Sequence, residues 1–193
     1  KSTIPILGGI HLEATQNGLT LTGSDSDLSI KTFIPHEKME GAEIIREGNI
    51  VLPAKEFSGI ARSMPNNEVV IELLDGLKVM ISSGKSNFTL NAMDGNEYPR
   101  LKETKGEGFT IKGEVLKTLM EKTFYAVSKT ETRPILTGVN VFFENNRIGM
   151  QATDAHRLSK VVGDTVEGVV PTENITIPGK AVKEIPTIIG NSK

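Results

Sequence analysis

The feature that most constrains the fold of this 193-residue chain is that its sequence repeats itself. The tripeptide PIL at 5–7 reappears at 134–136, an offset of 134 − 5 = 129 positions. The offset becomes 158 − 28 = 130 at Leu28 and 174 − 49 = 125 at Asn49, as surface loops of different length would produce. Ordered matches of this kind predict two copies of one fold. The paired residues are Gly9 and Gly138, Asn17 and Asn146, Asp25 and Asp154, Leu28 and Leu158, Ser29 and Ser159, Asn49 and Asn174, Ile50 and Ile175, Pro53 and Pro178, Lys55 and Lys180, and Ile60 and Ile185.

The two copies begin and end at different points of the repeat. A predicted strand and helix at 109–132 precede the second anchor, whereas the first copy begins almost at its own anchor. The first copy then continues well past Pro53, but the second stops soon after Pro178. Glycine-rich sequence before residue 109 suits a linker. We therefore expect two incomplete units: residues 1–105, lacking an N-terminal strand and helix, and residues 106–193, truncated at the C-terminus.

Hydrophobic periodicity predicts an α+β fold, with helices packed on one face of mostly antiparallel sheets. An amphipathic helix is expected at 114–127 and another at 54–64, where it stops before Pro65. A third helix begins at Gly179, and Pro186 is expected to kink or end it because proline lacks the donor that a helix interior needs. Alternation predicts strands at 10–14, 19–22, 28–34, 49–52, 69–73, 77–81, 88–93, 139–143, 148–153 and 174–177.

Composition excludes several classes of protein. The chain has no cysteine, which removes disulfides, thiolate zinc sites and cysteine nucleophiles. It has no apolar stretch long enough to span a bilayer and no signal peptide at its start, so we expect a reduced, cytoplasmic setting. The formal net charge of −2 argues against a protein that binds nucleic acid through overall positive charge. A local basic patch remains compatible with that sum.

The stretch Thr153-Asp154-Ala155-His156-Arg157 invites an enzymatic interpretation, with His156 as general base and Asp154 orienting it. Neighbouring residues of an extended strand point to opposite faces, however, and no serine or cysteine nucleophile motif accompanies them. The other two histidines are not spaced to share a metal with His156. We therefore expect no catalysis, no metal and no cofactor. The simplest structural alternative is a strand end and turn with a hydrogen-bonded histidine.

Five segments in this order resemble the bacterial β sliding clamp, the processivity subunit of DNA polymerase III. The resemblance covers essentially the whole chain and implies most of the first clamp domain and the front of the second. It implies tandem DNA-clamp domains with antiparallel sheets outside and helices lining the inner face. It also implies a homodimeric ring that encircles duplex DNA, confers processivity on the replicative polymerase and is associated with the nucleoid. The segments are TIPILGGIHLEA, GSDSDLSI, SGKSNFTLNAMDGNEYP, TRPILTGVNVFFE and ATDAHRLS.

The resemblance also implies which residues line the DNA channel. For any single lysine, a solvated surface charge is the simpler interpretation, but as a set these residues favour the channel. Where the family can carry aromatic or glutamine residues in this region, the chain has Thr130 and Pro134. The expected DNA-contacting residues are Lys1, Lys55, Lys129, Thr130, Arg133 and Lys180.

A second implied site is one wall of a pocket that receives a short apolar peptide from polymerases, the clamp loader and repair proteins. Leu158 would supply apolar contact, while His156 and Arg157 would supply donors. The other wall would come from a third domain. The residues implied for this wall are Thr153, Ala155, His156, Arg157 and Leu158.

The third implied site is the dimer interface. Phe88 and Leu90 alternate with polar neighbours, so one face of their strand is apolar. By resemblance this strand is a sheet edge that pairs with the partner subunit, whereas ordinary core packing is the alternative. The rival to the clamp interpretation as a whole is a duplicated α+β protein-interaction module without DNA binding.

Overall fold

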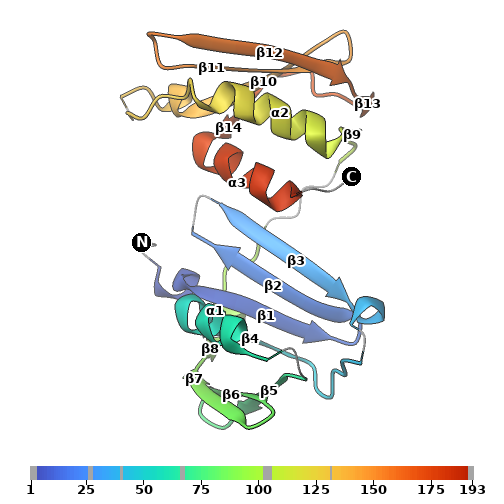
Figure 1. The fold of residues 1–193 in the computed structure, drawn as a ribbon, viewed down its shortest axis with the longest axis vertical. Coiled ribbons are helices and arrows are strands. Elements are labelled where there is room, and N and C mark those ends of the chain that lie inside the picture. The colour runs from blue at the N-terminus through green and yellow to red at the C-terminus, as the bar shows by residue number, and fades with distance from the viewer. Residues whose placement is uncertain are drawn as a thin grey trace. The chain divides into compact units, whose positions relative to one another are not determined.

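The computed structural model describes residues 4–25, 28–39, 41–65, 68–101, 106–130 and 132–190. The chain divides into two compact units, residues 1–102 and 103–193, and each is described by itself (Figure 1). Both units combine antiparallel strands with helices, which confirms the predicted α+β class. No helix in the described ranges is long and apolar enough to cross a membrane.

Unit 1 is built on a five-stranded antiparallel sheet in the order β3-β2-β1-β4-β8. Its first two strands meet at a turn that contains Gly18, whose φ of 144° favours glycine. Short 3-10 turns flank the sheet. The strands are β1 (Gly9–Thr15), β2 (Gly18–Ser24), β3 (Ser29–Pro35), β4 (Gly48–Pro53) and β8 (Met93–Asp94), and the 3-10 turns are η1 (Pro5–Gly8), η2 (His36–Lys38) and η3 (Gly95–Glu97).

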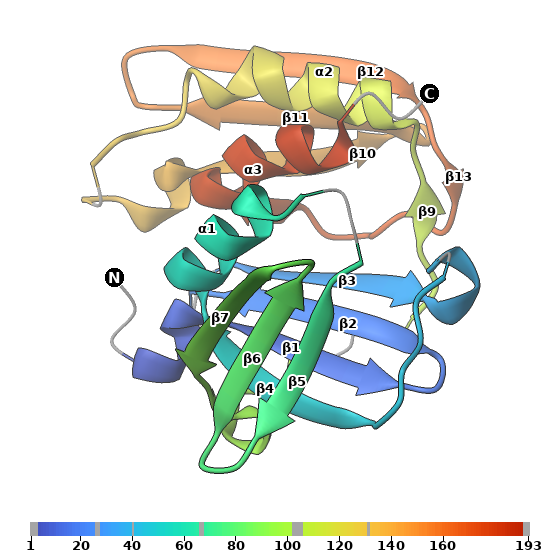
Figure 2. The same ribbon diagram turned by 60° about the horizontal axis from the view of Figure 1, so that its bottom comes forward.

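A helix and a three-stranded meander complete unit 1 (Figure 2). The helix ends before Pro65, as predicted, and Phe57, Ile60 and Met64 pack against the buried Leu12 and Leu52. The predicted strand at 88–93 is divided in the structure. Its last part leaves the meander and pairs with β4 as β8. The elements are α1 (Ala54–Ser63), β5 (Val70–Leu74), β6 (Lys78–Ser83) and β7 (Ser86–Asn91).

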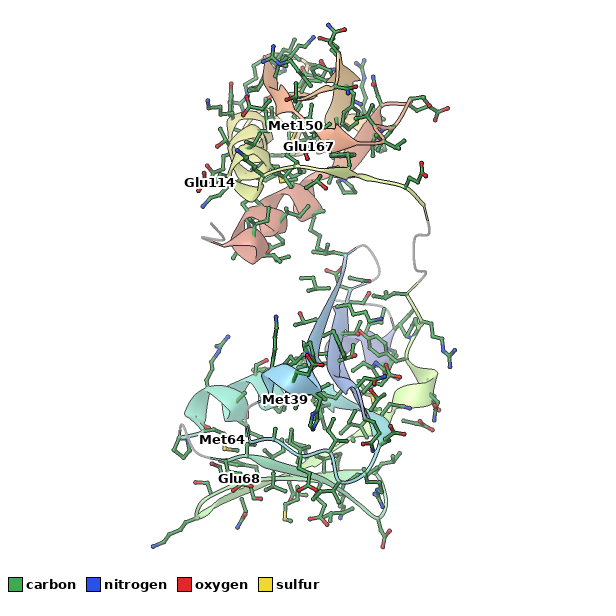
Figure 3. The ribbon with its side chains drawn as sticks, turned by 90° about the vertical axis from the view of Figure 1, so that its right-hand side faces the viewer. Met39, Met64, Glu68, Glu114, Met150 and Glu167 are labelled. Atoms are coloured by element: carbon green, nitrogen blue, oxygen red, sulfur yellow. The ribbon has the colours of Figure 1, made fainter. Side chains whose placement is uncertain are left out.

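Unit 2 places two helices on one face of a four-stranded antiparallel sheet in the order β12-β11-β10-β14. One helix packs over β11 and β12, and the other packs over β10 and β14. Figure 3 shows Met150 inside this unit, where it is fully buried. The elements are β9 (Phe109–Thr110), α2 (Gly113–Phe124), η4 (Pro134–Thr137), β10 (Gly138–Glu144), β11 (Arg147–Thr153), β12 (Leu158–Thr165), β13 (Glu167–Gly168), β14 (Ile175–Pro178) and α3 (Gly179–Ile189).

Two helix predictions need correction. Helix α2 ends at Phe124 instead of residue 127, and Thr123 near its end turns its hydroxyl back onto the Leu119 carbonyl at 2.7 Å. Of the two outcomes expected at Pro186, a kink or an end, the end is wrong, because helix α3 continues for one further turn. That turn is held by packing, because Ile189 lies so close to Gly113 that a Cβ there would come within 2.8 Å of its methyl carbon.

The register of the strands shows that the two units are copies. The pair His11 and Thr22 of unit 1 corresponds to Asn140 and Gln151 of unit 2. Gly9 and Pro53 likewise correspond to Gly138 and Pro178, with the offsets of 129 and 125 that the sequence predicts.

One detail of the predicted alignment is wrong. Ser24 pairs with Ser29, and Thr153 pairs with Leu158. Leu28 therefore corresponds to Arg157, and the offset stays at 129 through this turn instead of moving to 130.

Unit 1 leaves apolar surface open. In unit 2, α2 covers β11 and β12, but in the part of the chain that the structure describes no helix covers the corresponding β2 and β3. As a result Ile30 and Phe33 on β3 are exposed. Every residue of β5, in the separate meander, is exposed as well.

Candidate functional site

The turn between β11 and β12 is built by its own side chains. The Asp154 carboxylate accepts hydrogen bonds from the backbone N–H groups of His156 and Arg157 at 3.1 and 3.0 Å. The Thr153 hydroxyl donates to the Arg157 carbonyl at 2.7 Å and accepts from the Ala155 N–H at 3.1 Å. Ala155 adopts a φ of 75°, a left-handed conformation that a turn of this kind requires. The turn is therefore rigid before any ligand arrives.

Asp154 serves the turn and does not contact the His156 imidazole. Its partial desolvation raises the pKa, but the hydrogen bonds from His156 and Arg157, together with the guanidinium charge, bring the pKa of this carboxyl below its ordinary value. The ionised carboxylate bonds the backbone of His156 and not its imidazole. The dyad of a general base oriented by Asp154 is therefore absent from the described structure.

Arg157 is held from two sides. Its Nε donates to Asp154 Oδ2 at 2.9 Å, and its guanidinium carbon lies 5.6 Å from the centre of the Tyr125 ring. Tyr125 is the residue that caps the C-terminus of α2, and 57% of it is exposed. The sequence analysis missed Tyr125, because it lies off the apolar stripe of its helix. The clue that could have found it is that only two tyrosines occur in the chain.

Next to this arginine lies an exposed apolar residue. Leu158, the first residue of β12, is 65% exposed although the next residue, Ser159, is buried. The five residues predicted for the pocket wall lie together because all of them fall within the six-residue stretch 153–158, and Tyr125 joins them from α2 through its contact with Arg157. The surface combines a leucine, an aromatic ring and a guanidinium, which suits the capture of an apolar segment with polar backbone.

The cations predicted to contact DNA lie on exposed positions in each unit. Lys55 and Lys180 each occupy the second residue of a helix, α1 and α3, directly after the strand that ends in Pro53 or Pro178. Lys129 and Thr130 lie in the loop after α2, and Arg133 precedes η4. Lys1 lies outside the described residues.

The helices carry further cations that the sequence analysis did not single out. Arg62 lies seven residues after Lys55, on the same face of α1, and Lys183 follows Lys180 by three residues. Helical spacing was the signal that could have identified both. Each helix therefore presents two cations along one side instead of one.

Strand β7 forms the edge of the meander, because β6 is its only neighbour among the described strands. The predicted alternation is confirmed: Phe88 and Leu90 are half-buried, whereas Thr89 is exposed. Leu90 packs against the core of unit 1, so part of its role is structural. The Ala92 N–H donates to the Leu77 carbonyl at 2.7 Å. Since hydrogen-bonding residues alternate in an antiparallel pair, the Thr89 N–H faces the open edge.

Comparison with known proteins places both units in one family. Residues 1–102 match the family model of the DNA polymerase III beta subunit, N-terminal domain, and residues 110–193 match the model of its central domain. The chain belongs to the DNA polymerase III β subunit family.

Relatives of this β subunit family match the whole chain. The beta sliding clamp of Halalkalibacterium halodurans is 42% identical over 198 residues, and that of Bacillus subtilis is 41% identical over 198 residues. The crystal structure of the Bacillus subtilis DNA polymerase sliding clamp superposes with a TM-score of 0.92 at 40% identity. The DNA polymerase III subunit beta of Bartonella birtlesii, solved bound to griselimycin, gives 0.87 at 27% identity. The chain spans about half of each protein: 52% of the first three and 51% of the last.

Proposed function

We propose that this chain forms the first two domains of a sliding clamp that encircles duplex DNA and confers processivity on the replicative polymerase. The observation that carries the proposal is that two units with one strand register match successive domains of the β subunit family. We propose that the protein is a non-catalytic processivity factor, works as a homodimeric ring in the cytoplasm and is associated with the nucleoid.

The proposed DNA contacts use the exposed cations. Phosphates present a regular charge that does not depend on sequence, so Lys and Arg can contact and release them as the protein moves. The proposed set is Lys1, Lys55, Lys129, Thr130, Arg133 and Lys180. Because the formal net charge of the chain is −2, its direct attraction to DNA is weak. Closure of the ring around the duplex keeps the protein on the DNA.

We propose that the turn between β11 and β12 docks partner proteins. Thr153, Ala155, His156, Arg157 and Leu158 form one wall of a pocket for a short apolar segment of the polymerase, the clamp loader or repair proteins. The exposure of Leu158 beside a rigid turn supports this assignment, because a preorganised surface loses little entropy on binding. The relative from Bartonella birtlesii was solved with griselimycin bound, which supports a ligand site in this family.

We propose that β7 joins the partner subunit. An exposed strand edge favours pairing with another chain, and addition of a partner strand there would satisfy the outward N–H of Thr89.

The decisive experiment compares retention on circular and linear DNA. The full-length protein is loaded by its clamp loader and ATP onto nicked circular plasmid, and gel filtration then separates free from bound protein. A sliding clamp stays with the circle and is lost when a restriction enzyme linearises it. Equal retention on both forms, or none on either, would support a duplicated interaction module without DNA encirclement.

A further inference from the structure

Arg157 is anchored in a way that leaves one end of its guanidinium open. Its Nε donates to Asp154 at 2.9 Å, and its guanidinium carbon is 5.6 Å from the centre of the Tyr125 ring. Among the residues that the structure describes, its two terminal nitrogens have no protein acceptor. Those nitrogens carry the donors that match a carbonyl or carboxylate.

Tyr125 is placed beside Arg157 by the contact between α2 and β12. The Ser159 hydroxyl is buried and donates to the Lys122 carbonyl in the last turn of α2 at 2.7 Å. This bond ties the start of β12 to the end of the helix that Tyr125 caps. The C-terminal end of a helix also favours a nearby cation. The aromatic ring is therefore a fixed neighbour of the arginine.

The first unit provides an internal comparison. Its equivalent turn has the same backbone bond, from the Asp25 N–H to the Leu28 carbonyl, and the Asp25 side chain accepts from the Leu28 N–H at 3.0 Å. Leu28 stands where unit 2 has Arg157. The turn thus forms without an arginine. The fold does not require the contact between Arg157 and Tyr125, so a role in binding is the better explanation for both.

We propose that Tyr125 is a positioning residue for the docking pocket: its ring holds Arg157 so that the terminal nitrogens donate to a main-chain carbonyl or carboxylate of the docked peptide. This inference rests on the proposed docking function. Its physical basis is that an arginine already held by an aromatic ring and a carboxylate loses less freedom when it binds.

The test uses the full-length protein and a fluorescein-labelled peptide. Overlapping peptides from the organism's replicative polymerase are screened, and the tightest binder becomes the probe in an anisotropy titration. Tyr125→Leu keeps apolar bulk but removes the ring, and we expect roughly fivefold weaker binding. Tyr125→Phe keeps the ring and should bind within about twofold of the wild type. Because Tyr125 is mostly exposed, both variants should melt at the wild-type temperature.

A double-mutant cycle separates positioning from simple contact. In an Arg157→Ala background, Tyr125→Leu should weaken peptide binding little further, because Tyr125 acts through the arginine. An equal loss in both backgrounds, equal losses for the Leu and Phe variants, or no loss for Tyr125→Leu would overturn the proposal. Leu158→Ala reports on the docking function itself: if it weakens binding while Tyr125→Leu does not, only the role of Tyr125 fails. If neither variant changes binding, the docking surface is wrong.

Discussion

The hydroxyl of Ser159 lies 2.7 Å from the backbone carbonyl of Lys122 and donates a hydrogen bond to it. This bond joins residues that are 37 positions apart and connects β12 to α2. It brings the turn that carries Arg157 next to the helix end that carries Tyr125. The candidate docking surface thus depends on a buried polar contact that lies beneath it.

We expect Ser159→Ala to destabilise unit 2 by about 1 kcal/mol, because the hydrogen bond from the buried Ser159 to the Lys122 carbonyl is lost. Urea unfolding of the full-length protein, with a spectroscopic probe attached to unit 2, measures this change in the free energy of unfolding. Ser29→Ala is the matched control, since the Ser29 hydroxyl contacts Ser24 at 2.7 Å on the exposed surface and its loss should cost little. Equal costs for the two variants would mean that burial of the Ser159 bond has no energetic consequence.

We expect Ala155→Gly to stabilise the protein slightly, by about 0.5 kcal/mol. Alanine is strained at a φ of 75°, whereas glycine adopts this conformation freely, and the gain is partly offset by the greater freedom of glycine in the unfolded chain. Thermal melting compares this variant with Ala61→Gly on the exposed side of α1, which should destabilise by about 1 kcal/mol. Destabilisation by both variants would contradict the strain at Ala155.

We expect the stability of unit 1 to fall as the pH falls below about 6.5. His11 stacks on Tyr98 with ring centres 5.1 Å apart, and burial lowers the pKa of His11 although Glu13 opposes this effect. The unfolded state then binds a proton more readily than the folded state, so stability is full above the unfolded pKa and declines as the pH drops toward the folded value.

The variant His11→Phe tests the assignment of this pH dependence. Phenylalanine retains the stacking but carries no titratable proton, so the stability of the variant should depend less on pH between 5 and 7. Chemical unfolding at pH 5, 6, 7 and 8 measures the slopes. Identical slopes for the variant and the wild type would assign the acid sensitivity to other groups.

We expect the double variant Lys55→Ala and Lys180→Ala to bind DNA more weakly and with a flatter dependence on salt. Each phosphate contact that is lost should reduce the slope of log K against log salt by roughly one unit. Anisotropy with a duplex oligonucleotide at several salt concentrations measures the slope. Lys85→Ala, in the turn before β7, is the control and should retain the wild-type slope. A double variant with an unchanged slope would remove both helix lysines from the DNA contact.

We expect Thr89→Pro to convert the proposed full-length homodimer into monomers while unit 1 stays folded. The Thr89 N–H faces the open edge of β7, so proline removes a donor to the partner strand without breaking the ladder to β6. Sedimentation velocity gives the oligomeric state, and circular dichroism verifies the fold. Leu90→Lys is a poorer test because Leu90 also packs in the core. A folded Thr89→Pro protein that remains dimeric would place the interface elsewhere.

The sequence predicted most of the strands and helices, because the spacing of apolar residues along a segment depends on its secondary structure. Alternation located β1, β2, β10 and β11, and helical periodicity located α1 and α2 within a few residues. The repeat predicted two copies of one fold, and the structure gives them the same strand register: His11 pairs with Thr22 as Asn140 pairs with Gln151. Of the kink or end predicted at Pro186, the end is wrong, and so is the predicted offset at Leu28. The packing of Ile189 and the strand pairing on either side of the turn decided the structure there, and neither has a local sequence signature.

The sequence by itself determined the duplication, the α+β class and the residues of the turn that follows β11, because these depend on periodicity and on neighbours in the chain. Only the tertiary structure decided that Asp154 binds Arg157 and the backbone of the turn, that Tyr125 lies beside the arginine, and that Leu90 belongs partly to the core. The Asp154 bonds are local but depend on the backbone conformation of the turn, whereas the contacts of Tyr125 and Leu90 join segments that are distant in the chain. Their energies depend on how the elements meet in space, which the order of residues along the chain does not display.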